Sequence, residues 1–137
     1  MCLYGIRVLM NSNTTPWTLI EYVSTPISDG AILSDMAGLF HRTTPDALTQ
    51  ILQGGLKPGV QARKSGSKMI QLAPHAPWDR VRWQAQGRTD NRYSICLSFD
   101  RQALFEAEHP LNLAVNGIVV TGKTIPAQYI NRIYALR

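Results

Sequence analysis

The stretch LFHRTTPDALTQILQGGLKPG, residues 39–59, carries the signals for a strand followed by a helix. The apolar pair before His41 indicates the end of a short strand. Thr44 suits the N-cap of a helix and Pro45 its first position, where the N–H that proline lacks has no partner in the helix. Apolar residues then recur at helical spacing, and a pair of glycines ends the helix because glycine accepts a positive φ. The stretch therefore predicts a strand–helix unit with His41 at its junction.

The rest of the chain alternates short β-rich runs with short helical segments. Strands are predicted at MIQL (69–72), YSICLSF (93–99), IVVT (118–121) and RIYAL (132–136). Asp100 is placed to cap a helix over RQALFEAE, and Pro126 to start a short helix. Residues 74–87 mix turn residues with apolar ones, which predicts a loop containing a helical turn. This order predicts an α+β fold with a mostly antiparallel or split sheet, without the GxGxxG of a dinucleotide-binding fingerprint.

Residues 1–36 carry weaker signals. LYGIRVLM (3–10) and WTLIEYV (17–23) look like strands on either side of a turn-rich segment. STPISDG (24–30) is expected to be a loop, since it is rich in Ser, Pro, Asp and Gly.

Positive charge is concentrated in the middle of the chain. The whole sequence has a formal net charge of +5, and residues 57–92 contain eight basic and two acidic residues. A segment of this kind favours polyanions such as RNA or a pyrophosphate cofactor. A solvated basic loop is the alternative.

The two cysteines, Cys2 and Cys96, make no disulfide framework, and no CxxC or Cys/His cluster indicates a zinc site. We therefore expect no bound metal and a reducing, intracellular setting, most simply the cytoplasm. No apolar run approaches the length that a membrane span needs, so no membrane partner is expected.

Five motifs in order resemble the C-terminal half of the RNA 2'-phosphotransferase family. They are LFHRTT, ILQGGLKP, MIQLAP, GRTDNRYSICLSFD and NGIVVTGKTIPAQYI. In that family the corresponding elements are a strand ending in a Tyr-His-Gly-Thr type motif, a helix ending in Gly-Leu-x-Pro, a His-Val-His-Leu-Ser strand, an arginine before a strand ending in Asp, and Asn-Gly-Val-x-Leu-Thr followed by a Pro-containing element. The similarity spans about residues 38–136.

The resemblance implies an ADP-ribosyltransferase-like split sheet over residues 37–137 that binds NAD+, with residues 1–36 as an N-terminal extension. It also implies transfer of an RNA 2'-phosphate to NAD+ with release of nicotinamide, as in tRNA processing. The partner would be tRNA or another 2'-phosphorylated RNA.

The resemblance assigns roles residue by residue. His41 and Thr43 match the motif histidine and threonine, which contact the cofactor. Arg42 replaces the motif glycine and could add a phosphate contact or fill the pocket. Leu72 and Ala73 lie on the strand that matches His-Val-His-Leu-Ser, in which both histidines and the serine are replaced here. Arg88 matches the family's catalytic arginine, which steadies the anionic phosphate.

Two other functions stay open. One is an ADP-ribosyltransferase acting on a protein or nucleic-acid acceptor. The other is a module that binds NAD+, ADP-ribose or RNA without turnover, which the replacement of the motif glycine and the short N-terminal segment favour. No carboxylate stands out as a general base.

Three further side chains are expected to be peripheral. His75 and His109 lie in proline-flanked segments and are predicted at the surface. Trp78 could stack on a base, although core or rim packing is the usual use of a tryptophan.

Overall fold

The structure is a computed structural model, and it describes residues 23–59, 69–83 and 91–136. Its strands are β1 (Ser24–Pro26), β2 (Leu39–Thr43), β3 (Ile70–Leu72), β4 (Ile95–Phe99), β5 (Asn112–Ala114), β6 (Val119–Thr121) and β7 (Ile130–Ala135). Its helices are α3 (Gly30–Ser34), α4 (Pro45–Gly54), α6 (Arg80–Trp83) and α7 (Arg101–Glu106), with a 3-10 turn η1 (Ala127–Tyr129). The predicted strands 3–10 and 17–23 lie outside the described residues.

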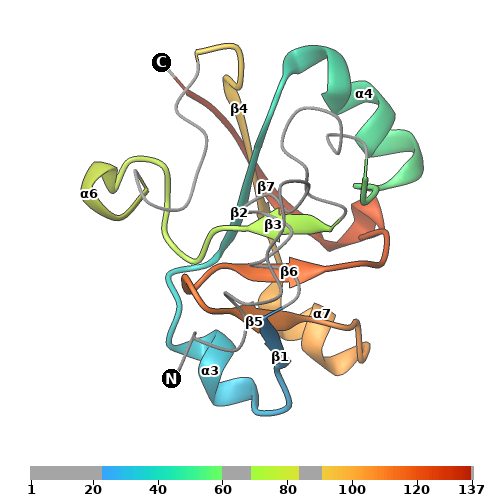
Figure 1. Cartoon of the computed structure of the whole chain (residues 1–137). Coiled ribbons are helices and arrows are strands. Elements are labelled where there is room, and N and C mark those ends of the chain that lie inside the picture. Colours follow the sequence, from blue (N-terminus) through green and yellow to red (C-terminus); the bar gives the residue numbers. More distant parts are fainter. Residues whose placement is uncertain (1–22, 60–68, 84–90, 137) are drawn as a thin grey trace, which may run out of the picture.

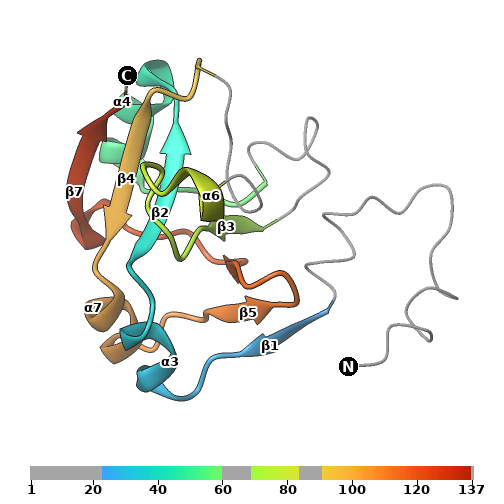
Figure 2. The ribbon, with the colours of Figure 1, turned by 90° about the vertical axis from the view of Figure 1, so that its left-hand side faces the viewer.

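The strands form two antiparallel sheets. One has four strands in the order β1-β5-β6-β3, and the other has three in the order β2-β4-β7. Figure 1 shows β2, β4 and β7 running steeply through the molecule, while β3, β6 and β5 run across them. Figure 2 shows the three-stranded sheet forming one side of the molecule. The prediction of an α+β fold with a split antiparallel sheet is confirmed.

Helix α4 begins and ends at the residues that the sequence indicates. The Thr44 hydroxyl accepts a hydrogen bond from the Ala47 N–H at 3.2 Å, and Pro45 occupies the first turn. Gly55 ends the helix at φ +84°, and its N–H donates to the Ile51 carbonyl. A Cβ at this glycine would lie 2.6 Å from the backbone oxygen of Ile125, so both the backbone angle and the space require glycine.

Helix α7 is capped as predicted, and it is hydrogen-bonded to α3 and the segment that follows it. Asp100 accepts a hydrogen bond from the Ala103 N–H at 3.0 Å. Arg101 then donates to the carbonyl oxygens of Leu33 (3.1 Å) and Met36, which joins α7 to the segment after α3. These contacts fix the chain that leads into β2.

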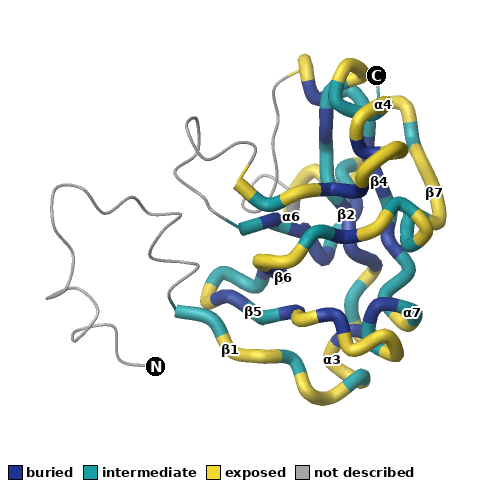
Figure 3. The backbone as a smooth tube through the Cα atoms, turned by 90° about the vertical axis from the view of Figure 1, so that its right-hand side faces the viewer, coloured by how far each residue is buried: buried dark blue, intermediate teal, exposed yellow. Residues whose placement is uncertain are grey.

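The main core lies where the two sheets and their helices meet. Its fully or nearly fully buried members come from almost every element: Leu33, Leu39, Ile51, Leu56, Ile70, Leu72, Leu97, Phe99, Leu104, Leu111, Val119 and Ile125. Figure 3 shows the buried backbone along β2, β4 and β6, with exposed stretches on α4 and β7. None of the helices in the described part of the chain has the length and apolarity to cross a bilayer.

Two short elements at the start of the described chain escaped the sequence analysis. The predicted loop at 24–30 contains β1, which pairs with β5 in the four-stranded sheet. Helix α3 follows, with Asp29 as its N-cap and Leu33 in the main core. Neither segment has an alternating or helical pattern long enough to detect, because each has at most five residues. Residues 24–34 are thus part of this fold.

Candidate functional site

Among the described residues, the backbones of the two sheets form hydrogen bonds with each other at one residue pair, where β2 passes the end of β3. Phe40 and Ala73 exchange both backbone hydrogen bonds, Phe40 N–H to the Ala73 carbonyl at 2.9 Å and the reverse at 2.8 Å. The pair is an isolated bridge, because the strands diverge on either side of it into different sheets. We call this place the β2–β3 junction.

His41 closes the gap just beyond this pair. Its Nδ1 lies 3.0 Å from the backbone oxygen of Gln71 on β3. A carbonyl oxygen can only accept, so Nδ1 carries the proton in this hydrogen bond. In the neutral ring Nε2 then has the lone pair and is an acceptor. The junction therefore fixes both the orientation and the tautomer of the imidazole.

The strand alternation places neighbouring residues of β2 on different faces. Leu39 packs in the main core, and His41 and Thr43 share its face. Phe40 and Arg42 take the other face, which we call the outer face of the three-stranded sheet. Across that sheet Arg42 stands opposite Cys96, and Cys96 opposite Tyr134.

Arg42 occupies the outer face, at the position where the family motif has glycine. Its Nε donates to the Tyr93 carbonyl at 2.7 Å, which ties β2 to the segment entering β4. The neighbouring Cys96 is fully buried, and burial raises the pKa of its thiol to about 12, against the opposing effect of the Arg42 charge. This thiol stays protonated and is no nucleophile.

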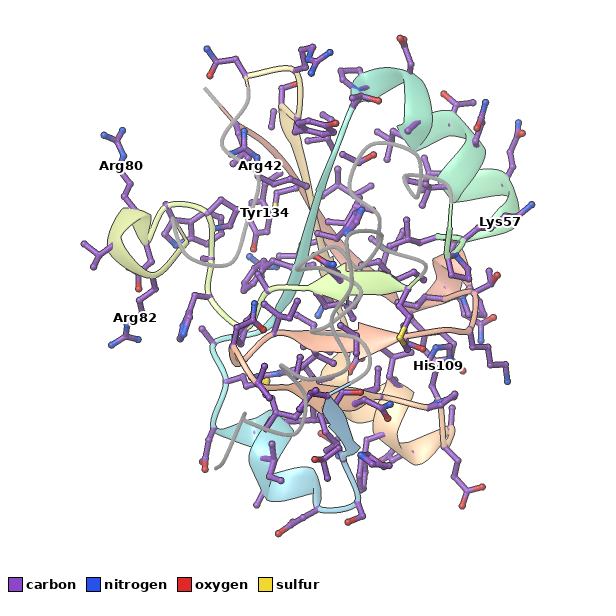
Figure 4. All side chains as sticks on the ribbon, viewed as in Figure 1. Arg42, Lys57, Arg80, Arg82, His109 and Tyr134 are labelled. Carbon is purple, nitrogen blue, oxygen red and sulfur yellow. The ribbon has the colours of Figure 1, made fainter. Side chains whose placement is uncertain are left out.

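A small aromatic cluster covers part of the outer face. Trp78 makes edge-to-face contacts with Phe40 (5.9 Å between centroids) and Tyr134 (4.9 Å), yet 58% of Trp78 is exposed. Figure 4 shows α6 on the same side of the molecule as Arg42 and Tyr134, with Arg80 and Arg82 pointing away from the fold. The tryptophan is thus a rim residue with an aromatic face available to solvent.

Gln71 is the residue that sequence reasoning missed. It lies on β3 directly opposite Val120 of β6, whose side chain has no exposed surface. The Gln71 Nε2 is buried and has no hydrogen-bond partner among the described residues. The resemblance placed it on the strand similar to His-Val-His-Leu-Ser, where it replaces the second histidine, but gave it no role.

The remaining predicted site residues differ in how far a ligand could reach them. Thr43 is 6% exposed and Ala73 3% exposed, both close to the junction. Leu72 is completely buried and packs in the main core. The structure thus brings His41, Leu72 and Ala73 together at the junction. Thr43 lies two residues further along β2, and Arg88 lies outside the described residues.

His109 is not at the surface, contrary to the prediction. It is buried, and its Nε2 lies 3.2 Å from the Thr121 hydroxyl, which also accepts from the Lys123 N–H. Burial lowers the pKa of His109, a backbone hydrogen bond with Lys123 opposes this shift, and the Lys123 charge adds to it. Figure 4 shows His109 well apart from Arg42, at the right of the molecule, so it does not belong to the same site.

The run GIVVTGKT, residues 117–124, fits the letters of the GxxxxGKT pattern of a phosphate-binding loop. It does not form such a loop. The pattern needs a glycine-rich loop between a strand and a helix. Here VVT is β6 itself, and Ile125 then bridges to Leu56 in an extended conformation. The local structure gives no cradle of backbone N–H groups.

Comparisons with known proteins leave the family open. No protein-family model matches the chain, and no curated protein matches it significantly in sequence.

Proposed function

We propose that this chain is an NAD+-dependent transferase of the RNA 2'-phosphotransferase type, with an ADP-ribosyltransferase-like fold and its cofactor site at the β2–β3 junction. The observation that carries the proposal is His41. It stands where two antiparallel sheets diverge, on the motif position, in a fixed tautomer. A place between two diverging sheets is one where a nucleotide ligand can be held by side chains from both.

The groups at the junction fit the nicotinamide ribose end of NAD+. The His41 imidazole, oriented by its Nδ1 hydrogen bond to the Gln71 oxygen, is proposed to contact a ribose hydroxyl. The Gln71 amide has a buried donor without a partner in the described structure. Thr43 and Ala73 are the buried residues proposed to flank the site.

Bound NAD+ supplies a ribose carbon with nicotinamide as its leaving group. The chain's own contribution is to orient the ribose through His41 and Thr43 and to keep the site partly dry through Leu72 and Ala73. Arg88, by its matched motif position, is proposed to stabilise the transferred phosphate through its planar fork of donors.

RNA is the proposed partner. Four cationic residues of the basic segment 57–92 lie in the described part of the chain, and all are exposed: Lys57, Arg80, Arg82 and Arg92. Arg82 forms a surface ion pair with Asp79 at 3.7 Å, a contact of little energetic weight. Arg80 and Arg82 project from α6 next to the exposed Trp78, a combination of charge and aromatic surface that suits single-stranded RNA.

A binding module without turnover is the second candidate, and Arg42 favours it. Its side chain occupies the place where a glycine would let a ligand approach the backbone. The hydrogen bond to the Tyr93 carbonyl holds that side chain in position. On this alternative NAD+ or ADP-ribose binds, and no nicotinamide leaves.

The first test is calorimetric titration of the full chain with NAD+, beside His41→Ala. Saturable binding that the variant loses supports the cofactor site. Absence of binding by the wild type would overturn the proposed function.

Nicotinamide release then separates the two candidates. The chain is incubated with NAD+ and a 2'-phosphorylated RNA, with the same RNA lacking the 2'-phosphate as control. Release that depends on the phosphate supports the transferase. Binding without release supports the module, and Arg42→Gly then shows whether the arginine is what blocks turnover.

A further inference from the structure

The side-chain Nε2 of Gln71 is buried, although the residue as a whole is partly exposed. Its cross-strand neighbour Val120 has no exposed surface, and Ala73, two residues along the same face, has almost none. Nε2 has no partner among the described residues. A buried donor without an acceptor costs free energy, and native proteins leave few such groups.

The backbone holds Gln71 in this position. Ile70 and Leu72 on either side are buried in the main core, and Leu72 has no exposed surface. A shift of one residue would move both of them out of the core, so the register of β3 is fixed. The Gln71 carbonyl also holds His41, so the backbone of this residue is committed to the junction.

We propose that Gln71 is a ligand-recognition residue whose Nε2 donates a hydrogen bond to the carboxamide oxygen of nicotinamide. The inference rests on the proposed function, because it requires NAD+ at the β2–β3 junction. The proposal gives a ligand contact to Gln71, a side chain to which the motif resemblance assigned no role.

A neutral carbonyl is the acceptor that suits this place. The glutamine amide carries no charge, and a phosphate oxygen beside Val120 and Ala73 would lose its hydration without gaining a counter-charge. A carbonyl needs only the donor that Gln71 has.

The proposal predicts opposite effects on affinity and on stability. Gln71→Leu removes a donor that has no partner in the free protein, so the free protein should unfold at the same or a higher urea concentration. The same change should raise the Kd for NAD+ about tenfold, because the bound carbonyl loses its partner. If Gln71 had only a structural role, Gln71→Leu would instead lower the urea concentration at which the free protein unfolds.

The experiment uses the full chain, NAD+ and ADP-ribose, which lacks nicotinamide. Wild type, Gln71→Leu and Gln71→Met are compared by calorimetry and by urea unfolding without ligand. Gln71→Met keeps the side-chain length in case leucine packs poorly. Gln53→Leu, the same change on an exposed position of α4, is the matched control. The expected result is weaker NAD+ binding, unchanged ADP-ribose binding and no loss of stability in both Gln71 variants.

Several results would overturn the proposal. Unchanged NAD+ affinity in both variants would show that the amide does not contact the ligand. An equal loss for NAD+ and ADP-ribose would place the contact outside the nicotinamide. Lower stability of both free variants would show that the amide already has a partner in the protein. Wild type that binds no NAD+ would remove the proposed function together with this inference, whereas wild-type binding that survives in the variants removes the inference alone.

Discussion

The Nδ1 of His41 donates to the backbone oxygen of Gln71 at 3.0 Å, and this hydrogen bond joins the two sheets directly beyond the Phe40–Ala73 pair. The His41 side chain thus adds a second hydrogen-bonded contact between β2 and β3, beside the backbone pair of Phe40 and Ala73. The geometry makes His41 both a structural connector and a candidate ligand contact, and the two roles can be measured separately.

We expect His41→Ala to lower the free energy of unfolding by about 1 kcal/mol, because the Gln71 carbonyl loses its donor. The same variant should lose measurable NAD+ binding. Urea unfolding and calorimetry give the two quantities. His75→Ala, in the loop after β3, is the control and should change neither. Undiminished NAD+ affinity in His41→Ala would remove this residue from the cofactor site.

A pair of glycine substitutions separates backbone strain from steric overlap. Gly55 and Gly59 have similar positive φ values, 84° and 79°, but a Cβ at Gly55 would lie 2.6 Å from the Ile125 oxygen, whereas one at Gly59 meets nothing within 4 Å. We expect Gly59→Ala to cost about 1 kcal/mol and Gly55→Ala about 3 kcal/mol. Urea unfolding of both variants checks this, and equal costs would show that the Leu56–Ile125 contact yields easily.

The stability of the protein should fall in mild acid through His109. Its pKa is lowered by burial in the folded state, from an ordinary value of 6.5. Above that value the ring is neutral in both states and contributes no pH dependence. Below it the unfolded chain binds a proton that the folded chain does not, so stability decreases as the pH falls.

The variant His109→Gln tests this pH dependence. Glutamine can still hydrogen-bond the Thr121 hydroxyl but does not titrate, so the loss of stability between about pH 7 and pH 5 should be smaller than in the wild type. Unfolding free energies at a series of pH values measure the slope. If His75→Gln reduced the slope and His109→Gln did not, the assignment would be wrong.

The Cys96 thiol should be inert in the folded protein. It is fully buried, and burial raises its pKa to about 12, so almost no thiolate is present near pH 8. In a Cys2→Ser background, Ellman's reagent should detect no thiol in buffer and one thiol in denaturant. Rapid reaction of the native variant would mean that β4 opens readily.

Local signals determined much of the fold. The caps Thr44 and Asp100, the first-turn Pro45 and the stop at Gly55 depend on residues within one helical turn, so the sequence alone locates α4 and α7. The α+β class and the split antiparallel sheet followed from the order of these elements. The sequence placed the end of the strand before α4 at His41, which is wrong, because β2 runs from Leu39 to Thr43 and His41 lies at its centre.

Only the tertiary structure decided which side chains meet. The three-residue strand β1 has no periodicity of its own and exists because β5 offers a pairing edge. His109 is buried because the chain after α7 folds back on β6, a long-range contact that no local pattern encodes. The unpartnered Nε2 of Gln71 appears only once β3 pairs with β6, where Gln71 stands opposite Val120 and its backbone oxygen accepts from His41. Spacing along the chain fixes helices and strands, whereas the satisfaction of each polar group depends on neighbours that only the packed sheets bring together.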